Sequence, residues 1–80
     1  METIYLDDFL SDGIIKEKEF REKVDGINWK CYKNKKVLIK GCSSVPVPTW
    51  SYLIITAHLV EYANQILYGE PCSAVKIYSR

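Results

Sequence analysis

Cys42 and Cys72 are the two residues in this sequence whose type and position best suit chemistry. Each follows a short apolar segment, residues 37–40 and residues 65–68. If these segments are parallel strands at neighbouring positions, both cysteines leave the same edge of the sheet, roughly 5–10 Å apart. Thiolates there could hold zinc or an iron–sulfur cluster, or carry out thiol redox chemistry. The alternative is that both are small, buried apolar residues.

Polar residues accompany both cysteines. Ser43 and Ser44 could help the first turn of a following helix bind an anion, and Thr49 is placed to cap that helix. Glu70 is either a ligand or a salt-bridge partner of Lys40 or Arg80, and the second interpretation is favoured. The candidate residues of these two loops are Cys42, Ser43, Ser44, Thr49, Glu70, Cys72 and Ser73. Two thiolates supply two of the four ligands of a tetrahedral metal site, and a two-fold dimer could supply all four. The cofactor stays open, and no catalytic residue is predicted.

The elements that must position these loops form a β-α-β unit. Residues 37–40 predict a strand, residues 50–63 a helix and residues 65–68 a second strand, an arrangement that is normally a right-handed parallel crossover. A short edge strand at residues 4–6, a helix at residues 16–24 and a terminal strand within residues 74–80 complete the pattern. The fold class predicted is a small α/β domain with a mixed sheet and two helices.

The predicted helix at residues 50–63 is apolar over most of its circumference. A helix with so narrow a polar stripe is buried on more than one side, and one small sheet cannot cover it all. We therefore expect a homodimer or docking on a larger protein complex. The residues expected at this interface are Trp50, Tyr52, Ile55, Leu59 and Tyr62.

Composition limits the protein class. Eighty residues predict one domain, residues 1–80, and an apolar fraction of 48% argues against disorder. The longest uncharged run is too polar to span a membrane. Three cysteines without an export signal predict a reducing, cytoplasmic location. Lysines between Lys30 and Lys40 could contact phosphates, but a solvated turn is the simpler interpretation, so nucleic-acid binding is not favoured.

Two segments carry a resemblance to a known family. KGCSSVPVPTWSY (residues 40–52) and YGEPCSAVKIYSR (residues 68–80) resemble the bacterial DUF2480 family, and LDDFLSDGIIKEKEFREKV (residues 6–24) is similar to its opening region. The resemblance implies longer relatives with two related halves, of which this chain carries the front of one and the end of the other. No activity of the family is established. The resemblance also implies a link to iron–sulfur cluster assembly, so we expect a non-enzymatic accessory protein.

Overall fold

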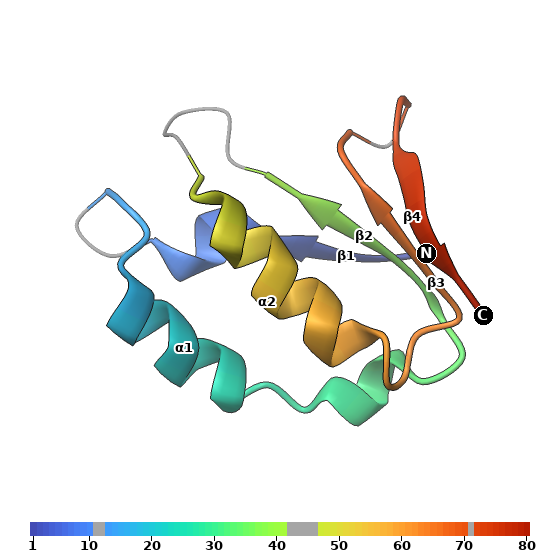
Figure 1. Ribbon diagram of the computed structural model, residues 1–80, viewed down its shortest axis with the longest axis horizontal. Coiled ribbons are helices and arrows are strands. Elements are labelled where there is room, and N and C mark those ends of the chain that lie inside the picture. The colour runs from blue at the N-terminus through green and yellow to red at the C-terminus, as the bar shows by residue number, and fades with distance from the viewer. Residues whose placement is uncertain (11–12, 42–46, 71) are drawn as a thin grey trace.

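The computed structural model describes residues 1–10, 13–41, 47–70 and 72–80. Within these residues the chain forms four strands, two α-helices and two 3-10 helices, so the predicted small α/β fold is confirmed (Figure 1). The elements in chain order are β1 (Glu2–Tyr5), η1 (Leu6–Phe9), α1 (Glu17–Asp25), η2 (Trp29–Tyr32), β2 (Lys36–Lys40), α2 (Thr49–Leu59), β3 (Gln65–Tyr68) and β4 (Val75–Ser79).

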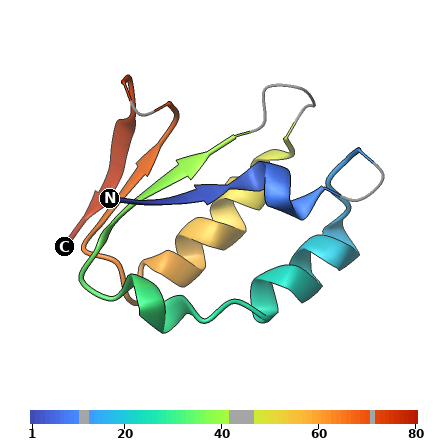
Figure 2. The same ribbon diagram turned by 180° about the vertical axis from the view of Figure 1, so that it is seen from behind.

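The sheet is mixed and has the strand order β1-β2-β3-β4. Strands β1, β2 and β3 are parallel, with Ile4 beside Ile39 and Ile39 beside Tyr68, whereas β4 is antiparallel to β3. The predicted parallel crossover from β2 through α2 to β3 is therefore confirmed, and the two strands are direct neighbours. Because β4 runs back along β3, the chain begins and ends at the same end of the sheet (Figures 1 and 2).

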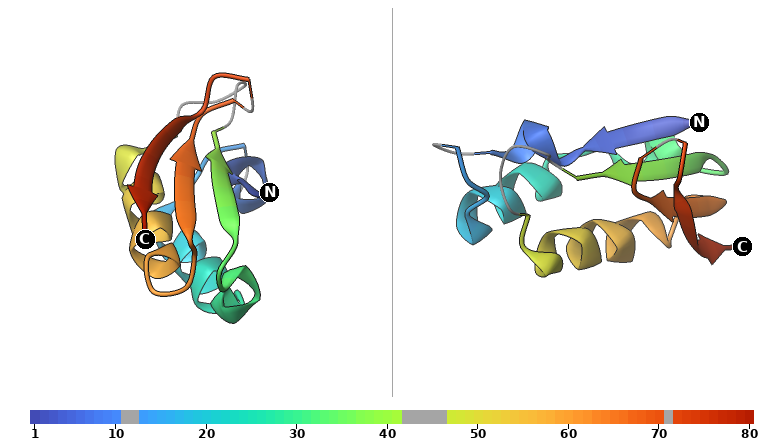
Figure 3. Two further views of the ribbon diagram at one scale, coloured as in Figure 1. Left: turned by 90° about the vertical axis from the view of Figure 1, so that its right-hand side faces the viewer. Right: turned by 90° about the horizontal axis from the view of Figure 1, so that it is seen from above.

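Both α-helices cover the same face of the sheet. When the molecule is viewed from the strand side, β2, β3 and β4 stand in front of α1 and α2 (Figure 3, left). The core lies between these layers, where Val37, Ile39 and Ile66 of the sheet meet Ile55 and Leu59 of α2. Leu38 points away from this layer and lies between Thr3 and Leu67 of the neighbouring strands.

Helix α1 follows the predicted pattern closely. Phe20 and Val24, four residues apart, are buried on its inner side, while Glu17 and Arg21 form an ion pair on the outer side at 2.9 Å. The helix ends at Asp25, one residue beyond the predicted end, and the amide of the capping residue Gly26 donates to the carbonyls of Lys23 and Val24. Periodicity of the apolar residues thus placed this helix correctly because its two sides differ strongly in polarity.

Helix α2 corrects the prediction of a long apolar helix. It spans eleven residues and ends at Leu59 rather than at Ala63. Its cap position is occupied by Pro48, so Thr49 is the first helical residue and not the predicted N-cap, and no side chain caps this end. At the other end the guanidinium of Arg80 donates to the carbonyls of Val60 and Glu61 at 3.2 and 2.9 Å. A distant residue therefore satisfies carbonyls that a longer helix would have bonded internally.

The 3-10 helix η2 fixes the far end of α2. Trp29 is 8% exposed, and its indole nitrogen donates to the carbonyl of Val24 at 3.1 Å. Its ring stacks on the imidazole of His58, with ring centres 4.9 Å apart. This contact accounts for a histidine in a helix that contains no Asp, Glu, Lys or Arg, since its ring packs as an aromatic surface.

Candidate functional site

The carboxyl ends of β2 and β3 meet at one edge of the sheet, as the predicted site requires. The amide of Gly69, directly after β3, donates to the carbonyl of Ile39 in β2 at 3.2 Å. Gly69 has a φ of 120°, which favours glycine strongly over any residue with a side chain. Beside it, the ammonium of Lys40 lies 3.7 Å from the carboxylate of Glu70. The predicted salt bridge of Glu70 is thus confirmed, and its exposed setting makes it a weak one.

The structure places the predicted thiol site only in part. Cys72 is exposed in the connection between β3 and β4, with Ser73 beside it. Cys42, Ser43 and Ser44 lie outside the described residues. Among the residues that the structure does describe, no group of three or more histidine, cysteine or acidic side chains is arranged to hold a metal ion. The shared use of Cys42 and Cys72 remains a prediction that rests on the neighbouring positions of their strands.

Cys31 lies away from this edge, as expected of a residue that precedes β2. It is exposed in η2, next to the half-buried Tyr32. Burial raises the pKa of the Tyr32 phenol above its ordinary value of 10.0, and electrostatic interactions with Cys31 and Glu2 raise it further. This environment keeps Tyr32 neutral and does not activate it for chemistry.

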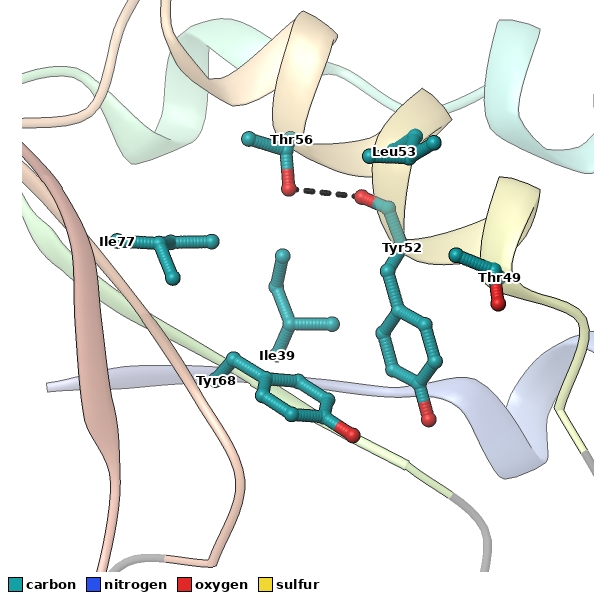
Figure 4. A pocket seen from close by; sticks show the side chains of 7 residues that line it. All are labelled: Ile39, Thr49, Tyr52, Leu53, Thr56, Tyr68 and Ile77. Atoms are coloured by element: carbon teal, nitrogen blue, oxygen red, sulfur yellow. Dashed lines mark hydrogen bonds between the residues drawn. The ribbon is translucent and has the colours of Figure 1, made fainter.

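An apolar concavity lies beside the edge where β2 and β3 end. It has a volume of about 500 Å³ and opens between α2 and the β3–β4 hairpin (Figure 4). Ile39 forms its floor, Leu53 and Thr56 of α2 lie on one side, and Ile77 of β4 lies on another. Apolar atoms form almost all of the lining, and no lining residue carries a formal charge. Such a surface binds apolar groups and offers no acid, base or nucleophile suited to catalysis.

Two tyrosines shape the end of the pocket nearest the loops. The rings of Tyr52 and Tyr68 meet edge to face, with centres 4.8 Å apart and planes at 82°. The hydroxyl of Tyr52 lies against the backbone of Gly41, where a Cβ atom would stand 2.5 Å from the hydroxyl oxygen. Gly41 is therefore the residue type that leaves room for Tyr52, and this contact joins the end of β2 to α2.

The residues predicted at the interface divide into two groups. Ile55 and Leu59 are fully buried in the core of the chain itself, so the folded protein cannot present them to a partner. Trp50, Tyr52 and Tyr62 are half-buried and pack against that core, with the ring of Trp50 5.5 Å from that of Phe20.

The sequence analysis did not single out Leu53, whose side chain is 64% exposed at the rim of the pocket. Helical spacing alone could not have found it, because apolar residues surround this helix; once Ser51 and Ile55 are known to be buried, position 53 faces the opposite way.

The whole chain matches one protein family. The family model described as "Protein of unknown function (DUF2480)" matches residues 1–39 and residues 26–80. The chain belongs to the DUF2480 family. No curated protein and no solved structure matches it. In the part of the chain that the structure describes, none of the helices has the length and apolar character needed to cross a membrane.

Proposed function

We propose that this DUF2480 protein is a non-catalytic interaction domain that acts as a homodimer. The observation that carries the proposal is the open apolar pocket of about 500 Å³ between α2 and the β3–β4 hairpin. Its lining suits an apolar side chain better than a substrate that needs acid–base chemistry, because no titratable carboxylate, imidazole or amine lines it.

The exposed apolar residues around the pocket support an interaction surface. Leu53 is 64% exposed, Ile77 is 48% exposed and Tyr68 is 42% exposed, and all three line the same pocket. Single exposed apolar residues are ordinary on protein surfaces, but a group of them around a concavity is typical of a binding site. Association would remove this surface from water, at about 25 cal/mol for each Å² of apolar area.

Sedimentation velocity over a range of protein concentrations tests the proposal. We expect a species with twice the chain mass of 9.3 kDa, with a dissociation constant in the micromolar range or below, about −8 kcal/mol. A chain that stays monomeric up to roughly 1 mM, where binding is worth only about −4 kcal/mol, would contradict the homodimer.

A second candidate function, in iron–sulfur or thiol metabolism, is supported by the topology of the sheet. Because β2 and β3 are parallel neighbours, the chain segments that lead to Cys42 and Cys72 leave the same edge. Anaerobic purification followed by visible absorbance and metal analysis tests it. We expect bound iron or zinc that is lost in Cys72→Ser and retained in the control Cys31→Ser. Equal, metal-free spectra of all three proteins would rule this function out.

A further inference from the structure

We infer that two copies pack through α2 about a two-fold axis, with Leu53 of each copy entering the pocket of the other. This inference rests on the proposed homodimer and specifies its interface. Leu53 projects from the rim of the pocket rather than into its floor, since it is 64% exposed while it lines the rim. One face thus carries both a protruding apolar side chain and a cavity. A two-fold interface needs this self-complementarity, because residue i of one copy meets residue j of the other and j meets i.

The outer side of α2 has the shape that close helix packing requires. Thr49, Leu53 and Ala57 are all exposed and succeed one another at intervals of four residues, so they form one stripe along the helix. Leu53 is the only large side chain of this stripe, and the smaller Thr49 and Ala57 flank it. Two such stripes can cross with the leucines offset, each beside the pocket of the facing copy.

Charge favours a second copy of this chain as the occupant. At a two-fold axis identical groups face one another, so any charge near the axis meets its like and weakens association. Helix α2, TWSYLIITAHL, contains no Asp, Glu, Lys or Arg, and the lining of the pocket contains none either. The outer side of α1, by contrast, carries exposed Glu17, Lys18, Arg21 and Glu22, and burying it against a copy would require removing these charges from water. A partner recognised by charge would find no complementary group on α2.

Pairing through the exposed edge of β4 is the alternative arrangement, and the structure opposes it. The register between β3 and β4 shifts between Ile66 and Leu67, and β4 carries an exposed lysine, Lys76. Irregular pairing and a lysine on an edge strand both discourage addition of a further strand. The uncharged helix face is the better surface for self-association.

The test compares two substitutions that add the same charge at equally accessible apolar positions. Leu53→Asp places a carboxylate in the proposed interface, whereas the control Ile14→Asp alters a residue that is 53% exposed and lies outside the pocket. Sedimentation velocity of the full chain should show dimer affinity lowered at least about 100-fold by Leu53→Asp and unchanged by Ile14→Asp. Circular dichroism verifies that both variants fold.

A photo-cross-linking measurement tests the same packing without relying on the folding of the Leu53→Asp variant. A benzophenone side chain introduced at position 53 should give a cross-linked species of twice the chain mass, and mass spectrometry of that species should identify the link to Ile77 or Tyr68 of the second copy. If the wild type is a dimer and Leu53→Asp dimerises equally well, or if the cross-links form only at other surfaces, this packing is wrong while the proposed homodimer stands. A monomeric wild-type chain would overturn the packing together with the proposed homodimer.

Discussion

The two α-helices cover the same face of the sheet, yet their outer surfaces are opposite in character. Helix α1 buries Phe20 and Val24 and turns exposed acidic and basic side chains to water, among them the paired Glu17 and Arg21. Helix α2 buries Ser51, Ile55 and Leu59 on its inner side but presents Leu53 and Ala57 on its outer side. The difference indicates that α1 needs only the sheet as a partner, whereas α2 has a second apolar surface that the described residues leave exposed.

The helices also end differently. The carbonyls at the end of α1 receive the amide of Gly26, which follows directly in the chain. The carbonyls that follow α2 receive the guanidinium of Arg80, from beyond β4. Helix α1 is thus largely a local structure, while α2 depends on residues that only the folded sheet brings near.

The largest effect on the free energy of unfolding is expected at the buried inner sides of the two helices, the feature that α1 and α2 have in common. Phe20 and Ile55 are both fully buried, and the ring of Phe20 contacts Phe9 and Trp50 at 5.1 and 5.5 Å. We expect Phe20→Ala to lower the free energy of unfolding by about 3–5 kcal/mol and Ile55→Ala by about 2–5 kcal/mol. Urea denaturation measures both, and Lys18→Ala on the outer side of α1 should stay within about 0.5 kcal/mol of wild type. A loss well below these values at either site would contradict the burial of that side chain between its helix and the rest of the core.

A smaller effect is expected where α2 meets the end of β2. Gly41→Ala would place a methyl group 2.5 Å from the present position of the Tyr52 hydroxyl oxygen, so the ring must move out of its contact with Tyr68. Such overpacking costs about 1–3 kcal/mol. In a Tyr52→Phe background the same substitution should cost measurably less, because the hydroxyl is gone. Equal costs in the two backgrounds, measured by thermal denaturation, would show that this contact does not anchor α2.

The smallest expected effect tests the distant capping of α2. Arg80→Ala removes two charge-assisted hydrogen bonds to the carbonyls of Val60 and Glu61. Because these bonds are exposed, we expect a loss of about 1 kcal/mol in the free energy of unfolding. Hydrogen exchange should increase at the last turn of α2 and stay unchanged in α1. The control Arg21→Ala, which breaks an exposed pair within α1, should cost less than about 0.5 kcal/mol. If Arg80→Ala and Arg21→Ala lower the free energy of unfolding equally, the hydrogen bonds of Arg80 do not stabilise the end of α2 more than an ordinary surface ion pair does.

The β-α-β unit and helix α1 were predictable because their signals are local. Two apolar runs separated by a helix predicted parallel strands, and the structure makes β2 and β3 neighbours. The salt bridge of Glu70 with Lys40 also followed from sequence, since the crossover brings the ends of both strands to one edge. The role of Gly41 did not follow, because nothing near it in the chain announces that Tyr52 will lie on its backbone.

The sequence by itself determined the fold class, the charged helix α1 and the apolar character of α2, because each depends on periodicity over a few turns or residues. It could not decide which side of α2 meets the sheet, since apolar residues surround that helix and every orientation fits the pattern. Only the tertiary structure buried Ile55 and Leu59, left Leu53 exposed beside Ile77, and ended the helix at Leu59, directly before the carbonyls that Arg80 binds. Those outcomes depend on strand order and on contacts between residues far apart in the chain, which local patterns do not encode.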